Sequence, residues 1–262
     1  MIQGIFIDID GTLVSLKTHR AHPKDVVALK KAKAAGVKLF VATGRHIGVR
    51  EEGYVLDGLY DLFDGFVCTT GQYCFTADGY TVLKNSINPE DVKAVVQMTR
   101  KHQIPCTYAD EKNLYINMVN DRVIEHNKKI QLPIPPVREM QESDEMLSIT
   151  LYMTPEEEQN LLKPLLHHSN TVSWMEGIVD ILPKSGGKMS GIRAMADYFG
   201  IGLDEIMAIG DSSNDLDMIL AAAIGVATAD APQELKKHSN FVTSVCEEAG
   251  IEKALLHFGV IT

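Results

Sequence analysis

An apolar run that ends in two acidic residues opens the chain: Ile5-Phe6-Ile7-Asp8-Ile9-Asp10-Gly11-Thr12-Leu13. Such a run is typical of a buried parallel strand, and open α/β sheets bind ligands at the carboxyl ends of their strands. The stretch therefore predicts Asp8 at that edge of a sheet, with Asp10 on the following turn. Two carboxylates this close require a cation or a shared proton. The alternative is an acidic turn that merely ends a strand.

A second parallel strand is predicted shortly downstream. A helix that begins at Pro23 and ends at Gly36 is followed by an apolar strand, residues 37–42, which stops at Thr43-Gly44-Arg45. Strand, helix and strand with short connections form a right-handed βαβ unit, so both strands end at the same edge of the sheet. Thr43 is therefore expected beside Asp8.

The rest of the chain predicts two domains. A helix (46–57), a strand (64–68) and a hairpin (72–83) follow, and the chain then becomes more polar and irregular. The polar segment predicts helices that begin near residues 89, 121 and 155 and strands over 105–109, 113–118, 146–153, 171–174 and 178–182. We therefore predict a discontinuous α/β core, residues 1–83 and 185–262, and an inserted α+β domain, residues 84–184.

The parallel pattern resumes after the insert. Lys188 begins a helix that runs to about residue 199, and the next strand, 205–209, ends at Gly210-Asp211-Ser212-Ser213-Asn214-Asp215. A short helix, a strand (224–227), a helix (232–237), a strand (241–242) and a final helix (247–258) complete the prediction. The acidic and amide residues around Asp211 again follow an apolar strand.

The composition argues against a nucleic-acid-binding protein, a signal peptide and a membrane-spanning segment. The chain has 262 residues, of which 45% are hydrophobic, and its net charge of -10 makes a nucleic-acid partner unexpected. Its four cysteines form no CxxC pair, which indicates reduced thiols and a cytoplasmic protein. Met1 leads directly into a strand, so no signal peptide is expected, and no apolar run approaches the ~18 residues that span a membrane.

The residues expected at the sheet edge indicate phosphoryl transfer. Carboxylates such as Asp8, Asp211 and Asp215 suit Mg²⁺, and a carboxylate can also attack phosphorus. Lys188 at a helix start, with the Thr43 hydroxyl and the Gly44 amide, offers donors to phosphate oxygens. Separately, these residues would also suit a plain turn, a solvated helix end and a helix cap; their joint order favours a single site.

That order resembles the haloacid dehalogenase (HAD) superfamily. Asp8-Ile9-Asp10-Gly11-Thr12 matches its first motif, Thr43 the second, Lys188 the third, and the segment from Gly210 to Met218 the fourth. The chain is most similar to the Cof-type phosphatases of subfamily IIB. The resemblance implies a three-layer Rossmannoid core with a parallel sheet, an α+β type 2 (C2B) cap, and hydrolysis of sugar phosphates or other small phosphate esters.

The resemblance also implies roles for individual residues. Asp8 is the nucleophile and Asp10 the general acid and base; Asp8, the Asp10 carbonyl and Asp211 bind Mg²⁺, with Asp215 in support. Thr43, Gly44, Lys188 and Asn214 bind the phosphoryl group. Many relatives carry Asn-Gly after the third strand, whereas this chain has Thr70-Gly71. Residues expected to influence specificity are Arg45, Thr70, Trp174 and Glu176.

Two other functions share this core. One is a phosphomutase of the phosphomannomutase type, which transfers the phosphoryl group to substrate rather than to water. The other is a non-catalytic sugar-phosphate-sensing protein, against which the complete set of charged motif residues argues. For the phosphatase, we expect a small phosphorylated metabolite as the partner, no nucleic acid or membrane, and a monomer or weak homodimer.

Overall fold

The computed structural model describes residues 1–46, 56, 58–130 and 133–262. The helix predicted over residues 46–57 falls almost entirely outside this range. Contacts divide the chain into two units, Met1–Lys84 with Gly187–Thr262, and Asn85–Gly186. Each unit is described by itself below.

The first unit is built on an eight-stranded sheet with the order β13-β12-β11-β1-β2-β3-β4-β5. Its strands are β1 (Gly4–Ile7), β2 (Lys38–Ala42), β3 (Gly65–Cys68), β4 (Tyr73–Thr76), β5 (Thr81–Lys84), β11 (Ile206–Gly210), β12 (Ile224–Ala227) and β13 (Phe241–Val242). The strands from β13 to β3 are parallel, whereas β4 and β5 pair antiparallel. The central strand β1 pairs Ile7 with Ile209 and Val41, so β1, β11 and β2 end together.

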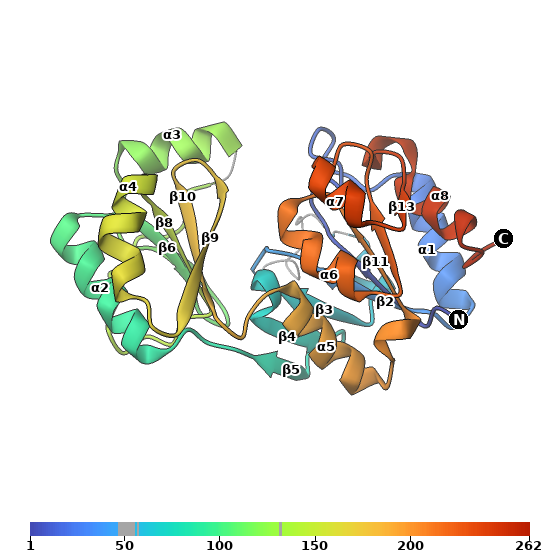
Figure 1. The fold of residues 1–262 in the computed structure, drawn as a ribbon, viewed down its shortest axis with the longest axis horizontal. Coiled ribbons are helices and arrows are strands. Elements are labelled where there is room, and N and C mark those ends of the chain that lie inside the picture. The colour runs from blue at the N-terminus through green and yellow to red at the C-terminus, as the bar shows by residue number, and fades with distance from the viewer. Residues whose placement is uncertain (47–55, 57, 131–132) are drawn as a thin grey trace. The chain divides into compact units, whose positions relative to one another are not determined.

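Helices cover both faces of this sheet (Figure 1). They are α1 (Pro23–Ala34), α5 (Lys188–Phe199), α6 (Leu216–Ala221), α7 (Gln233–His238) and α8 (Gly250–His257). On one face, Phe6 and Phe40 stack with ring centroids 4.5 Å apart, in a core with Ile192 of α5 and Ile219 of α6. On the other face, α1 packs against α8 and β2. This is the three-layer α/β arrangement that the sequence predicts.

The second unit is an antiparallel sheet with the order β7-β6-β8-β10-β9 and helices packed on it. Its elements are α2 (Pro89–His102), β6 (Cys106–Ala109), β7 (Leu114–Ile116), α3 (Asp121–Ile130), β8 (Ser148–Tyr152), α4 (Pro155–Glu157), β9 (Ser169–Met175) and β10 (Ile178–Pro183). All five strands lie where the sequence predicts them, to within a few residues. The unit has its own hydrophobic core, which includes Val95, Tyr108 and Ile149.

Two of the predicted helices are irregular in the structure. The helix that starts after Thr154 is regular only over Pro155–Glu157 and continues as a wide turn and a 3₁₀ turn, where Pro164 has no N–H to donate. The final helix is interrupted at Ala249, whose φ is 58°. A 3₁₀ turn, Cys246–Glu248, precedes that residue, and α8 follows it.

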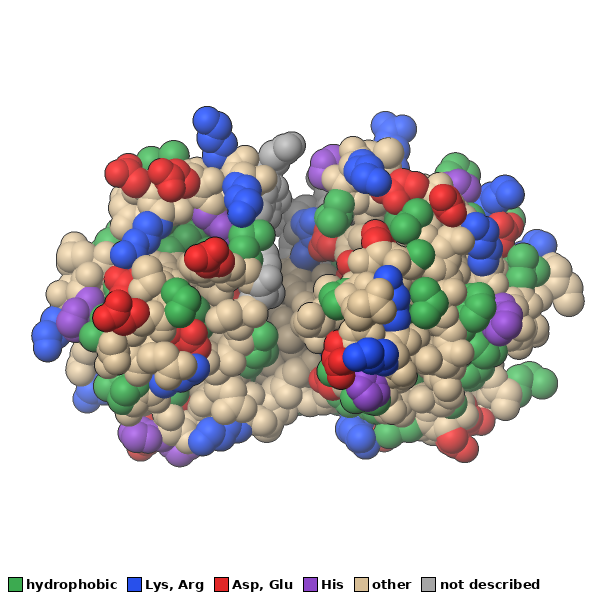
Figure 2. Space-filling model, turned by 45° about the horizontal axis from the view of Figure 1, so that its top comes forward, with side chains coloured by type: hydrophobic (Ala, Val, Ile, Leu, Met, Phe, Trp, Pro, Cys, Tyr) green, Lys and Arg blue, Asp and Glu red, His purple; other side chains and the backbone are tan. Residues whose placement is uncertain are grey.

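The charged side chains on the surface and the state of the cysteines are consistent with the amino-acid composition. Figure 2 shows basic and acidic side chains interspersed over the face that it draws. All four cysteines are buried, and none of them forms a disulfide in the described part of the chain. Within the described residues, the helices are too short or too polar to cross a bilayer.

Candidate active site

The site begins with a buried ion pair at the end of β1. Asp8 directly follows the strand and is 5% exposed, and its N–H donates to the Ile209 carbonyl of β11. Lys188, the first residue of α5, is fully buried, and its Nζ donates to Asp8 Oδ1 at 2.6 Å and to Asp215 Oδ1 at 2.5 Å. Asp8 and Lys188, which lie 180 positions apart in the chain, are therefore directly paired, and Asp215 shares the same ammonium.

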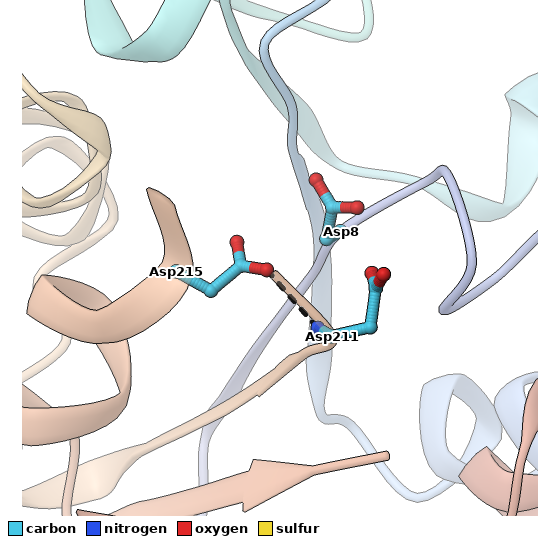
Figure 3. Close-up of side chains that lie close together, drawn as sticks. All are labelled: Asp8, Asp211 and Asp215. Atoms are coloured by element: carbon cyan, nitrogen blue, oxygen red, sulfur yellow. Dashed lines mark hydrogen bonds between the residues drawn. The ribbon is translucent and has the colours of Figure 1, made fainter. Parts of the chain in front are cut away.

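Asp211 completes a cluster of acids. Asp8, Asp211 and Asp215 each offer a carboxylate oxygen, and these oxygens lie within 4.8 Å of one another (Figure 3). The N–H groups of Asp211 and Ser212 donate to Asp215 Oδ2, which fixes the turn after β11. Thr12 donates its hydroxyl to Asp211 Oδ1 at 2.7 Å and so ties the turn after β1 to the cluster.

Burial and neighbouring charges shift the pKa values of Asp8, Asp211 and Lys188. Burial raises the pKa of Asp8 well above its ordinary value, and Asp215 and Asp211 add to the rise, although Lys188 opposes it. Burial, again with Asp215, raises the pKa of Asp211 to about 7 against the hydrogen bond from Thr12. Burial disfavours the charge on Lys188, but Asp215 and Asp8 outweigh it, so the pKa of Lys188 lies above its usual range.

The donor set fits a hard divalent cation. Three carboxylates face one ammonium, so a further positive charge would balance the cluster. The backbone carbonyl of Asp10, on the adjoining turn, accepts no hydrogen bond from the described residues. Carboxylate and carbonyl oxygens are the ligands that Mg²⁺ prefers.

Asp10 lies apart from the cluster and is paired with Arg45. Arg45 Nε and Nη2 each donate to one oxygen of Asp10 at 2.6 Å, a two-pronged ion pair across the turns after β1 and β2. Thr43, which directly follows β2, is 1% exposed, and its hydroxyl accepts from the Arg45 N–H at 3.1 Å. This ion pair fixes the Asp10 side chain, whereas the Asp8 carboxylate pairs with Lys188.

Gly44, Thr70 and Asn214 come together from three different turns. A Cβ on Gly44 would lie 3.5 Å from Thr70 Oγ1 and 3.9 Å from Asn214 Nδ2. Ser212 donates its hydroxyl to Asn214 Oδ1 at 2.7 Å, which orients the amide. The point at which a side chain of Gly44 would begin therefore lies within contact range of two polar groups.

Two contacts that position Lys188 were not predicted. Gly71 packs so closely that a Cβ there would lie 2.1 Å from the Gly187 carbonyl. Asp217 Oδ2 accepts the Met189 N–H at 3.2 Å and so caps α5, whose own preceding residue, Gly187, offers no capping side chain. The second acid in Asp215-Leu216-Asp217 was the available sequence signal for this cap.

The remaining predicted residues belong to the second unit. Trp174 lies in β9, and the described part of the structure does not include its side chain. Glu176 is exposed on the turn between β9 and β10. Their predicted influence on specificity stays a prediction.

The first unit thus has a largely parallel sheet, and an acid cluster, a buried lysine and the polar groups around Gly44 lie at its strand ends. Together these features define an α/β enzyme of phosphoryl transfer. The chain belongs to the family of haloacid dehalogenase-like hydrolases, whose model matches residues 5–255.

Solved structures agree with this family. The HAD subclass IIB sugar phosphatase BT4131 is 34% identical with a TM-score of 0.88, covering 99% of this chain and 100% of that one. The HAD phosphatase BT1666 from Bacteroides thetaiotaomicron is 31% identical with a TM-score of 0.89, covering 100% and 96%. A phosphoglycolate phosphatase from Methanothermobacter thermautotrophicus is 27% identical over 98% of this chain and 99% of its own length.

The predicted family and fold class are therefore confirmed: the chain is a HAD phosphatase with a Rossmannoid core and an inserted α+β unit. It is a phosphoric monoester hydrolase.

Proposed function

We propose that this chain is a Mg²⁺-dependent phosphatase that hydrolyses small phosphate esters, foremost sugar phosphates, through an aspartyl-phosphate on Asp8. The observation that carries the proposal is the Asp8 carboxylate, which is held by Lys188 at 2.6 Å beside the acid cluster. The identity of 34% to a sugar phosphatase supports the substrate class.

Asp8 is suited to the first step. One of its oxygens forms a bond to phosphorus while the bond from phosphorus to the leaving oxygen breaks, and protonated Asp10 gives its proton to that oxygen to release an alcohol. Lys188 already contacts Asp8 and supplies a positive charge for the phosphoryl oxygens. The Thr43 hydroxyl and the Gly44 amide add neutral donors.

Asp10 is suited to the second step. Its carboxylate takes a proton from water, the water oxygen bonds to phosphorus, and the bond from Asp8 to phosphorus breaks to release phosphate. Asp10 keeps that proton for the next cycle. Since both of its oxygens accept from Arg45 in this structure, Asp10 has to release one of these two bonds to reach the leaving oxygen, while the other bond keeps its side chain in position.

Asp8, Asp211 and the Asp10 carbonyl would hold Mg²⁺, with Asp215 behind them. The bound ion would supply positive charge to the phosphoryl oxygens and would lower the repulsion between them and Asp8. Lys188 alone leaves the cluster negative, which is why we include the metal in the proposal.

A screen of phosphorylated metabolites with Mg²⁺, read as released inorganic phosphate, tests the function. The matched control is Asp8→Asn, which has nearly the same shape and no attacking carboxylate. We expect turnover on sugar phosphates by the wild type and none by the variant. Near-normal turnover by Asp8→Asn would refute the nucleophile assignment.

The same screen separates the two other functions. A phosphomutase would convert substrate into its isomer with little free phosphate. A sensing protein would bind esters, seen as a thermal shift, without consuming them.

A further inference from the structure

The turn after β3 has an unusual backbone. Thr69 and Thr70 both have φ of 52°, and Gly71 follows with φ of 87°. Branched residues avoid this left-handed region because the side chain crowds the neighbouring carbonyl. Two consecutive threonines therefore hold a conformation that glycine or asparagine adopts more readily, and such strain persists at functional sites where the surroundings impose it.

The surroundings hold this turn on both sides. The Thr69 N–H donates to the Arg45 carbonyl at 2.8 Å, and the Thr70 N–H donates to the Thr43 carbonyl at 3.0 Å. Gln72 is fully buried and donates its side-chain amide to the Thr70 carbonyl at 3.1 Å. Since Gly71 packs against Gly187, the turn links the loop of Thr43 to the start of α5.

The turn brings the Thr70 hydroxyl close to Gly44. Thr70 Oγ1 and Asn214 Nδ2 lie 3.5 Å and 3.9 Å from the point that a Cβ on Gly44 would occupy. The Thr70 hydroxyl makes no hydrogen bond within the described ranges 1–46, 56, 58–130 and 133–262. A hydroxyl donor and an amide donor therefore lie beside the same point at Gly44.

We propose that Thr70 is a substrate-contact residue whose hydroxyl donates, beside the Asn214 amide, to a phosphoryl oxygen, and that the strained turn fixes it there. This inference rests on the proposed phosphatase function of the same site. A phosphoryl group carries its charge on oxygens that accept several donors, and neutral donors near Gly44 complement the charge of Lys188.

Two substitutions separate the hydroxyl from the strain. Thr70→Val keeps the branched shape and removes the donor, whereas Thr70→Ser keeps the donor and removes the branch. For Thr70→Val we expect kcat/KM to fall, and the inhibition constant of inorganic phosphate to rise, by about 10- to 100-fold, as for the loss of one hydrogen bond to a charged group. Thr70→Ser should stay close to the wild type in both measurements.

Thermal unfolding tests the strain in the same preparations. Thr70→Gly relieves the backbone, so its Tm should exceed that of the wild type while its kcat/KM falls as in Thr70→Val. The matched control is Thr228→Val, at a buried threonine after β12 whose hydroxyl has no partner in the described part of the chain. That variant should keep both activity and phosphate inhibition.

Two results would overturn the inference. One is unchanged kcat/KM and phosphate inhibition in Thr70→Val. The other is an equal loss in Thr70→Val and Thr70→Ser with a lowered Tm in both, which would show a structural role only. Asp8→Asn keeps the two proposals apart: turnover by that variant removes the proposed function, whereas a normal Thr70→Val beside an inactive Asp8→Asn removes only the role of Thr70.

Discussion

Asp25 is a buried carboxylate that joins α1 to α8. The residue is fully buried, and its Oδ1 accepts the Glu252 N–H at 2.7 Å, so it caps α8 from another helix. Its Oδ2 is buried and has no partner in the described part of the chain. Burial raises the pKa of Asp25 to about 6, although the N–H groups of Glu252 and Ile251 oppose the rise.

The raised pKa predicts how stability depends on pH. The folded state binds the Asp25 proton more tightly than the unfolded chain, whose ordinary pKa is 3.8. The stabilising contribution of that proton is therefore complete below pH 3.8 and is lost as the pH rises through about 6. A difference of about two pK units corresponds to roughly 3 kcal/mol in total, of which about 1.4 kcal/mol falls between pH 5 and pH 8.

Asp25→Asn keeps an acceptor for α8 and cannot ionise. We expect the free energy of unfolding of the variant, relative to the wild type, to rise by about 1.4 kcal/mol from pH 5 to pH 8, a change of roughly 3–6 °C in Tm. Urea and thermal unfolding of both proteins across this range measure it, and the pH dependence of all other groups cancels in the difference.

Asp91→Asn is the matched control. Asp91 is equally buried, but both of its oxygens accept N–H groups, from His167 and His168 at 3.0 Å each. Although burial acts to raise the pKa of Asp91, these hydrogen bonds lower it below its ordinary value, so the control should show no gain toward high pH. A difference between wild type and Asp25→Asn that does not change from pH 5 to pH 8 would refute the reasoning.

Three further predictions concern the site. Lys188→Met leaves Asp8 and Asp215 buried without their cation, so turnover should vanish and unfolding free energy should fall by roughly 3–5 kcal/mol; unchanged stability would contradict the buried pair. Chelation by EDTA should abolish turnover, and Mg²⁺ should raise the Tm of the wild type more than that of Asp211→Asn; equal shifts would argue against Asp211 as a ligand. Arg45→Met should lower kcat/KM because Asp10 loses its positioning, and an unchanged pH–rate profile would count against that role.

The sequence by itself determined the order of elements and the site motifs. Apolar runs such as residues 5–7 and 37–42 indicate buried strands, and the rule that parallel strands end at one edge brings Asp8 and Thr43 into one region. Lys188 and Asp211 follow from the same argument, because each begins a helix or ends a strand. These patterns are local, so they can be recognised from the sequence alone.

Partnerships between distant side chains were decided only by the tertiary structure. The pairing of Asp10 with Arg45 and the capping of α5 by Asp217 depend on how separate turns pack. The break in the final helix is similar: the predicted helix is interrupted at Ala249, and the next residue, Gly250, packs so closely that a Cβ there would lie 2.4 Å from the Ser244 carbonyl.

Asp8 and Asp10 show most clearly what the sequence determined and what only the tertiary structure decided. The sequence predicted that Asp8 and Asp10 lie close together at the end of one strand, but the residues alone left open which of them attacks phosphorus. In the folded chain Asp8 turns to the buried Lys188, 180 positions away, and Asp10 turns to Arg45. Burial and charge decide this separation, and both arise only when the strands and helices have packed.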